Sequence, residues 1–297
     1  FTPALSFYAT GDVVIGSATQ STTVDGTACQ ETPGAPLCSF GVGDSLAIGA
    51  GSTVSAGTVV VEGSLSIGSM GSLSVASVSY GAIGTLTGNV TATTLTLSTA
   101  TQSQDPFAVG SHVSFTNLMV QRDITLSSAI SVPGDLTLHE GTLEVGTQTV
   151  AVGGDMLVRS SSVLDMSESA GIVKVAGGFE YASYTMSTLS AGVIRIGGAV
   201  LLGPYGQFQP SGTHQVKLVA SDTATVRVES DYSGNHFRHL TVTAPHLSVT
   251  SALTVTQRLP VSGTLALGLS GHPVELDSSG AALILDGSVM IGPGSTW

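Results

Sequence analysis

One short phrase occurs three times between Thr149 and Leu202, and it constrains the fold more than any other feature of the chain. The copies read Val150-Ala-Val-Gly-Gly154, Val173-Lys-Val-Ala-Gly-Gly178 and Ile194-Arg-Ile-Gly-Gly198. Each is an alternating run with apolar residues on one face, and each ends in a glycine pair whose backbone can take conformations that other residues avoid. Such a run predicts a short β-strand followed by a turn.

The spacing of the copies predicts how these strands are arranged. Their second glycines, Gly154, Gly178 and Gly198, lie 24 and 20 residues apart, and Gly134 adds another interval of 20. A repeat of about 20 residues with short strands and no helix predicts one coil of a parallel β-helix, a β-solenoid of the all-β class. Parallel crossovers are nearly always right-handed, so we expect right-handed winding. Glycines six residues apart at 51, 57 and 63 are typical of left-handed β-helices and leave that alternative open.

Composition narrows the range of partners. Charged residues make up 9% of the 297 residues, and the net charge is -12 with only eight Lys and Arg. Phosphate binding needs clustered basic residues, so we expect neither nucleic acid nor an anionic membrane surface as partner. The most apolar window, Ala191 to Leu202, contains Arg195 and is too short to cross a bilayer, so we expect no membrane insertion.

Longer similarities predict four regions. Coil-like phrases begin with Ser45-Leu-Ala-Ile-Gly49 and Ser64-Leu-Ser-Ile-Gly68, and Gly141-Thr-Leu-Glu-Val-Gly146 matches Gly263-Thr-Leu-Ala-Leu-Gly268 at an offset of 122. We therefore expect an amino-terminal edge or cap at 1–42, coils at 43–114, a module at 115–236 and its incomplete second copy at 237–297. A start at Phe1 without methionine favours a mature product or an excised fragment, and the end at Trp297 has no evident cap.

Cys29 and Cys38 are the only cysteines, and they enclose a segment with two prolines and a glycine. These residues predict a loop, and a disulfide between Cys29 and Cys38 would close it. A disulfide favours an oxidising, extracytoplasmic setting. The alternative is a pair of reduced cysteines packed as small apolar groups.

The carboxyl-terminal half resembles a known kind of sequence. The segments that carry the resemblance are Gln207-Phe-Gln-Pro-Ser-Gly-Thr-His-Gln-Val-Lys-Leu218, Phe237-Arg-His-Leu-Thr-Val242 and Val261-Ser-Gly-Thr-Leu-Ala-Leu267. Over about residues 107 to 290 the chain resembles the repeat of large secreted bacterial β-helix proteins of the adhesin type. This resemblance implies placement outside the cell or on its surface and a binding or structural role. It transfers no catalytic residues.

Asp135 and Asp155 follow equivalent glycines of consecutive coils, so their carboxylates are expected to stack. Such a pair could bind a cation or raise one pKa. The alternative is that both are exposed turn residues that accept hydrogen bonds from nearby backbone amides.

Glycosidases and polysaccharide lyases also use parallel β-helices, with acids along one face. Glu140, Glu144, Asp165 and Glu168 are the carboxylates best suited to acid and base catalysis here. Their neighbours offer no basic or aromatic residues at matching positions. We therefore expect a protein that is not an enzyme and needs no cofactor, with polysaccharide binding or degradation as the alternative.

Lys174 and Arg195 occupy the same outward column, where stacked like charges are unfavourable unless an acid or a ligand separates them. A carbohydrate or a neighbouring subunit could be that ligand, and a solvated face is the alternative. His236, His239 and His246 lie close in sequence, but residues three apart on a strand face opposite ways, so we expect no metal site.

Threonine pairs such as Thr91-Ala-Thr93 and Thr94-Leu-Thr96 resemble the flat faces of ice-binding solenoids. We find no recurrence at one coil position and interpret them as ordinary strand residues. Together these features favour an extracellular structural rod, either a segment of a surface adhesin or a subunit of a filament assembled by end-to-end stacking.

Overall fold

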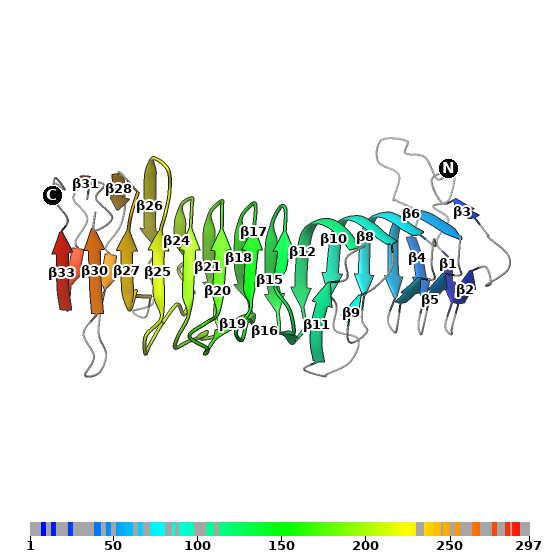
Figure 1. The fold of residues 1–297 in the computed structure, drawn as a ribbon, viewed down its shortest axis with the longest axis horizontal. Helices are drawn as coiled ribbons and strands as arrows, with labels where there is room; N and C mark the ends of the chain where they lie inside the picture. Colours follow the sequence, from blue (N-terminus) through cyan, green and yellow to red (C-terminus); the bar gives the residue numbers. More distant parts are fainter. Residues whose placement is uncertain are drawn as a thin grey trace. The chain divides into compact units, whose positions relative to one another are not determined.

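The computed structural model describes residues 7–9, 13–15, 23–25, 39–42, 46–48, 52–61, 65–67, 72–80, 85–86, 89–97, 105–109, 113–229, 235–244, 246–249, 253–255, 263–267, 275–277, 283–285 and 287–291. These residues contain short parallel strands and no helix (Figure 1). The chain divides into two compact units, Phe1–Ser128 and Ala129–Trp297. The chain is a parallel β-solenoid, as the sequence predicts.

In the part of the second unit that the structure describes, eight parallel strands form one sheet, which we call the eight-stranded sheet. Its strands, in spatial order, are β14 (Ile130–Val132), β17 (Thr149–Val152), β20 (Ile172–Val175), β23 (Val193–Ile196), β25 (Gln215–Leu218), β27 (His239–Val242), β30 (Gly263–Leu267) and β33 (Gly287–Ile291). They define about seven turns of about 22 residues, slightly more than the predicted 20.

Two other faces complete each turn of the second unit. The second sheet contains β15 (Leu136–Glu140), β18 (Met156–Ser160), β21 (Phe179–Ser183), β24 (Val200–Leu202), β26 (Thr223–Val228), β28 (His246–Val249) and β31 (Glu275–Asp277). The third contains β16 (Thr142–Glu144), β19 (Val163–Met166) and β22 (Thr188–Leu189), and β29 (Leu253–Val255) pairs with β32 (Leu283–Leu285). One turn therefore passes through β17, β18 and β19 in order.

Alternating side chains fill the space between these sheets. Six apolar residues of alternating positions are buried, at 0 to 3% exposure: Leu136, Leu138, Leu143, Val145, Val150 and Val152. Strand pairing stacks each on its equivalent in the next coil, as Val150 on Val173 and Val173 on Ile194. Each such residue stabilises the fold by roughly 1.5 to 3 kcal/mol. Because the interior carries this stabilisation, the outward positions are free to vary.

The largest fully buried side chains of the described residues form an aromatic cluster in the core. The ring of Phe208 lies 6.0 Å from that of Phe179, 5.5 Å from that of Tyr181 and 5.6 Å from that of Phe237, each in edge-to-face geometry. All four side chains are at most 2% exposed. The Tyr181 hydroxyl donates to the carbonyl of Thr185 at 2.7 Å, which satisfies its polar end.

The glycine pairs lie in the turns between the eight-stranded sheet and the second sheet, and the equivalent residues differ by one from the prediction. The amide of Gly177 donates to the carbonyl of Gly154, and the amide of Gly198 donates to that of Gly177. The aligned row is therefore Gly154, Gly177 and Gly198. Gly178 instead continues the row of Asp135 and Asp155, because Leu136, Met156 and Phe179 are paired.

The reason for these glycines is also different from the predicted one. Positive φ angles among the described glycines occur at Gly141, Gly146, Gly192 and Gly212, none of which belongs to a pair. A Cβ at Gly154 would lie 2.9 Å from the backbone of Gly134, and a Cβ at Gly177 would lie 2.6 Å from the carbonyl oxygen of Gly154. At Gly154 and Gly177 glycine is required because the coils stack too closely there for a side chain.

The first unit has the same principle of construction. Its longest sheet contains β1 (Phe7–Ala9), β4 (Ser39–Val42), β6 (Thr53–Val61), β8 (Ser72–Tyr80), β10 (Asn89–Leu97) and β12 (Val113–Gln121), and β3 (Thr23–Asp25) also pairs with β6. Smaller sheets contain β2 (Val13–Ile15), β5 (Leu46–Ile48) and β7 (Leu65–Ile67), and β9 (Thr85–Leu86), β11 (Asp105–Val109) and β13 (Ile124–Leu126).

Hydroxyl residues of the first unit recur at the same coil positions, contrary to the prediction from the threonine pairs. Thr91 pairs with Ser74 and Ser114, and Ser74 pairs with Ser55. Thr94 likewise continues a column whose members are Thr58, Ser77, Thr94 and Asn117. The coils align residues that are 17 to 23 positions apart, so one fixed spacing does not reveal the columns.

The longer repeat does not correspond to a whole number of coils. Gly141-Thr-Leu-Glu-Val-Gly146 contains β16 of the third sheet, whereas its match beginning at Gly263 forms β30 of the eight-stranded sheet. The matched phrases therefore occupy different faces of the second unit. The four predicted regions and the handedness of the coils stay predictions. Cys29 and Cys38 lie outside the described residues, so their disulfide stays a prediction as well.

Candidate functional site

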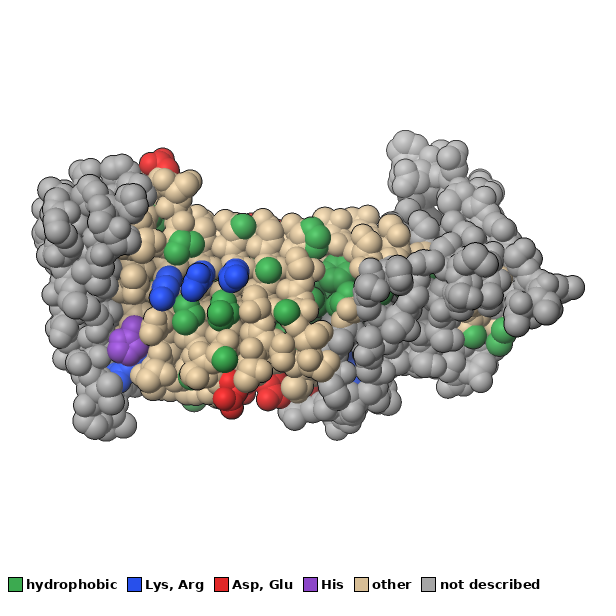
Figure 2. All heavy atoms as spheres, in the orientation of Figure 1, with side chains coloured by type: hydrophobic (Ala, Val, Ile, Leu, Met, Phe, Trp, Pro, Cys, Tyr) green, Lys and Arg blue, Asp and Glu red, His purple; other side chains and the backbone are tan. Residues whose placement is uncertain are grey.

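Three cations stand in one row on the outer face of the eight-stranded sheet. Lys174 of β20 pairs with Arg195 of β23, which confirms their predicted common column, and Arg195 pairs with Lys217 of β25. Lys174 and Arg195 are exposed and Lys217 is half-buried. We call these three residues the cationic ladder; Figure 2 shows it as a row of Lys and Arg side chains across neighbouring coils.

Acidic residues are missing from the strands around this ladder. The described strands of the eight-stranded sheet contain three of the chain's eight Lys and Arg and none of its 20 Asp and Glu. Parallel strands lie about 4.8 Å apart, so neighbouring like charges in this row repel one another. The ladder is a concentration of positive charge on a protein whose net charge is -12.

Two arginines elsewhere in the second unit are each paired with a carboxylate. Arg159 of β18 forms a bidentate pair with Glu180 of β21, at 3.0 and 2.9 Å. Arg227 of β26 contacts the carboxylate of Glu229 at 2.5 Å. Both arginines belong to the second sheet. No such ion pair involves the cationic ladder within the described part of the chain.

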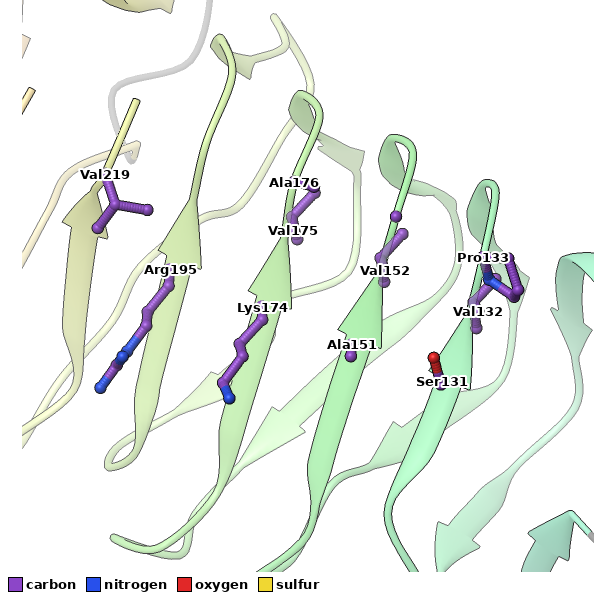
Figure 3. A pocket seen from close by; sticks show the side chains of 11 residues that line it. Ser131, Val132, Pro133, Ala151, Val152, Lys174, Val175, Ala176, Arg195 and Val219 are labelled. Atoms are coloured by element: carbon purple, nitrogen blue, oxygen red, sulfur yellow. The ribbon is translucent and has the colours of Figure 1, made fainter. Parts of the chain in front are cut away.

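Small and apolar side chains border the ladder on the side of the turns. Strand register places Pro133, Gly153, Ala176, Gly197 and Val219 in one column, two residues beyond the cations. An open hollow of about 330 Å³ is lined by Pro133, Gly153, Ala176 and Val219 of this column and by Lys174 and Arg195 of the ladder. In Figure 3 the side chains of Lys174 and Arg195 run side by side along one edge of this hollow. Ile172 and Val193 border the ladder on its other side.

Lys217 is the member of the ladder that the sequence analysis missed. Its strand, Gln215-Val-Lys-Leu218, has the alternation of the repeated phrase, but Val219 and Ala220 stand where the glycine pair is expected. The alternation of Val216, Lys217 and Leu218 was the available signal. Without the glycines it did not establish the register.

The carboxylates of Asp135 and Asp155 are part of the turn structure. An Asp135 Oδ1 accepts the amide of Asp155 at 2.8 Å, and the Asp155 Oδ1 accepts the amide of Gly178 at 2.6 Å. Both aspartates therefore act as turn residues that accept hydrogen bonds from backbone amides, which was the alternative to a cation site. A cation between Asp135 and Asp155 stays a prediction. Among the described residues no three His, Cys, Asp or Glu side chains are placed to hold a metal ion together.

Two of the four candidate catalytic acids are brought together. Glu144 of β16 pairs with Asp165 of β19, and the next residue in that column is Thr188. Burial raises the pKa of Asp165, a hydrogen bond from Ser167 opposes this, and the charge of Glu144 raises the pKa further. Glu140 and Glu168 are exposed at other points of the coil. Glu144 and Asp165 belong to the third sheet and the cationic ladder to the eight-stranded sheet, so the two sets do not converge.

The three histidines considered as a metal site do not share a sheet. His239 lies in β27, His246 begins β28 of the second sheet, and His236 contacts the carbonyl of Pro210 at 3.3 Å. The histidine that stands out is the fully buried His214, whose Nδ1 contacts the carbonyl of Ala191 at 2.6 Å. Burial lowers the pKa of His214 to about 4, although that hydrogen bond opposes the shift.

Comparison with models of known families finds no match, and neither does comparison with curated proteins or with solved structures. The described residues include no helix with the length and hydropathy needed to span a membrane.

Proposed function

We propose that the protein is an extracellular, non-enzymatic structural β-solenoid, either a segment of a surface adhesin or a subunit of a filament that assembles end to end. The observation that carries this proposal is the unbroken strand register of the eight-stranded sheet from β14 to β33. Stacked coils of this kind give a stiff scaffold in which each turn is held by its neighbours. The resemblance of residues 107 to 290 to secreted bacterial adhesin repeats supports the same role.

The inner surface of the second unit supports a scaffold role. Its stacked columns are apolar, and buried hydroxyls are used to join coils, as when the Ser183 hydroxyl donates to the carbonyl of Ser162 at 2.6 Å. The turns are joined in the same way by Asp135 and Asp155. These serine and aspartate side chains therefore connect one turn to the next by hydrogen bonds.

Electron microscopy and sedimentation velocity over a concentration series test the proposal. Filaments whose length grows with protein concentration are the expected result for a self-assembling subunit. Monomeric particles at every concentration would contradict the filament version and leave the adhesin segment. Catalytic turnover of any polysaccharide by the purified chain would contradict the structural role itself.

A polysaccharide-degrading enzyme is the second candidate, and the stacked pair Glu144 and Asp165 is the observation that favours it. A carboxyl group with a raised pKa beside a second carboxylate is typical of a general acid and its partner. This candidate predicts release of reducing ends or unsaturated products from polysaccharides. An Asp165→Asn variant would abolish that release, and Asp222→Asn, which changes an exposed acid outside the candidate set, serves as its control.

A further inference from the structure

We propose that the outer face of the eight-stranded sheet binds a linear acidic polysaccharide through Lys174, Arg195 and Lys217. This inference rests on the proposed extracellular role, and it names the ligand class that such a scaffold would hold. The three cations are consecutive members of one column. The strands around them contain no carboxylate within the described residues, so the charge is left for an external anion.

The ladder is unfavourable without a ligand. In a row of parallel strands the charges follow one another at about 4.8 Å, and like charges at this separation destabilise a sheet. An acid at any of the three positions, or opposite them, would remove the repulsion. A ligand with anions repeated along its length would do the same, and the Arg195 guanidinium can bind a carboxylate or sulfate through two parallel hydrogen bonds.

The borders of the ladder fit sugar rings. Apolar and small residues accompany the cations on both sides: Ile172 and Val193 on one, and Ala176, Gly197 and Val219 on the other. Ala176 and Val219 line an open hollow of about 330 Å³ beside the first two cations. Pyranose rings present apolar C–H faces between their polar groups, so a sugar chain can pack on these residues while its anions reach the cations.

The borders of the ladder favour a polysaccharide over other polyanions. An extended acidic peptide lacks the rigid C–H faces of sugar rings, so it would reach the cations without packing on Ile172, Val193 and Val219. Single-stranded nucleic acid is usually held by aromatic stacking as well as by cations, and the described strands of this sheet contain no Phe, Tyr or Trp.

Binding of sodium polygalacturonate to the full chain at low ionic strength, measured by calorimetry, tests the proposal. Heparin forms a second arm that separates sulfate from carboxylate recognition, and neutral dextran, poly-L-glutamate and single-stranded DNA complete the series. The test variant is Lys174→Gln/Arg195→Gln/Lys217→Gln. Arg227→Gln is the matched control, because it also removes a surface cation but from an ion pair on the second sheet.

We expect polygalacturonate or heparin to bind, and the affinity to fall as salt is added. Each exposed cation is expected to contribute about threefold, so the triple variant should bind roughly 30-fold more weakly, while Arg227→Gln stays within about twofold. Lys174→Arg/Lys217→Arg should retain affinity because it keeps the charges. If the triple variant does not fold, Arg195→Gln alone should lower affinity about threefold.

Three results would overturn the inference: no binding of either acidic polysaccharide, equal binding by wild type and triple variant, or equal or tighter binding of poly-L-glutamate or DNA. Self-association of the wild type that the triple variant loses would identify a second copy of the chain as the occupant instead. Loss of polysaccharide binding with intact assemblies in the microscope would leave the proposed scaffold role in place. Turnover of the bound polysaccharide would contradict the scaffold role and leave the site.

Discussion

A methyl group added at Gly177 is expected to destabilise the second unit, whereas one added at the neighbouring Gly178 is not. In Gly177→Ala the new Cβ would lie 2.3 Å from the Asp155 Oδ1 and 2.6 Å from the Gly154 carbonyl oxygen. In Gly178→Ala the nearest atom is the Ala199 carbonyl oxygen at 3.3 Å. Neither glycine has a positive φ. The two variants lie in the same turn and differ in the space available for the new methyl group.

The expected loss of unfolding free energy in Gly177→Ala follows from the groups that the methyl group displaces. Ordinary contact begins at 3.4 Å, so the coil at Gly177 must shift by 3.4 − 2.6 = 0.8 Å from the coil before it, against 3.4 − 3.3 = 0.1 Å at Gly178. Overpacking of this kind costs about 1 to 3 kcal/mol. Moving the Asp155 carboxylate aside also gives up its hydrogen bond from the Gly178 amide, worth about 1.5 to 3 kcal/mol. Lower entropy of the unfolded alanine chain returns about 0.4 to 1 kcal/mol.

Gly177→Ala should accordingly lose about 3 kcal/mol of unfolding free energy, and Gly178→Ala should stay within about 0.5 kcal/mol of wild type. Guanidinium unfolding followed by circular dichroism measures both. Because solenoids need not unfold in one step, hydrogen exchange of the amides in β18 and β21 provides a local measure. Equal destabilisation by the two variants would refute close stacking as the reason for the glycine pairs.

Three further predictions concern other parts of the chain. The pKa of His214 is about 4 in the folded protein against 6.5 in the unfolded chain, so the free energy of unfolding is expected to fall by about 3 kcal/mol as the pH drops from 6.5 to 4. In His214→Asn, which keeps a donor for Ala191, this pH-dependent loss should be absent when unfolding is measured across the same range. The same pH profile in wild type and variant would contradict His214 as the cause. Phe208→Ala should cost about 3 to 5 kcal/mol in thermal or chemical unfolding, because its buried ring contacts three others. Cys29 and Cys38 should resist alkylation until a reductant is added, as judged by intact mass, and labelling without reductant would contradict the disulfide.

The sequence was enough to predict which side chains of a strand point inward and which point outward. Val150 and Val152 face inward and Ala151 outward because successive residues of any strand point to opposite faces. The common column of Lys174 and Arg195 followed from the same local argument, since both lie centrally in copies of one phrase. These features depend on a few neighbouring residues and need no knowledge of the rest of the coil.

Which residues lie on top of one another was decided by the tertiary structure. Ile130, Val150, Val173, Ile194 and Val216 are successive members of one column, at steps of 20, 23, 21 and 22 residues. Turns absorb the extra residues, so the spacing of glycines misplaced Gly178 by one position. The place of Lys217 in the cationic ladder was missed because its strand is not followed by the glycine pair that marks the register.

The sequence alone therefore determined that the chain consists of short strands with an apolar face, and that they repeat closely enough to stack in parallel. The tertiary structure decided the register between coils, and with it the cationic ladder, the row of Gly154, Gly177 and Gly198, and the pairing of Glu144 with Asp165. The physical reason is that side-chain direction is a property of the strand, whereas register is set by hydrogen bonds between coils whose turns differ in length.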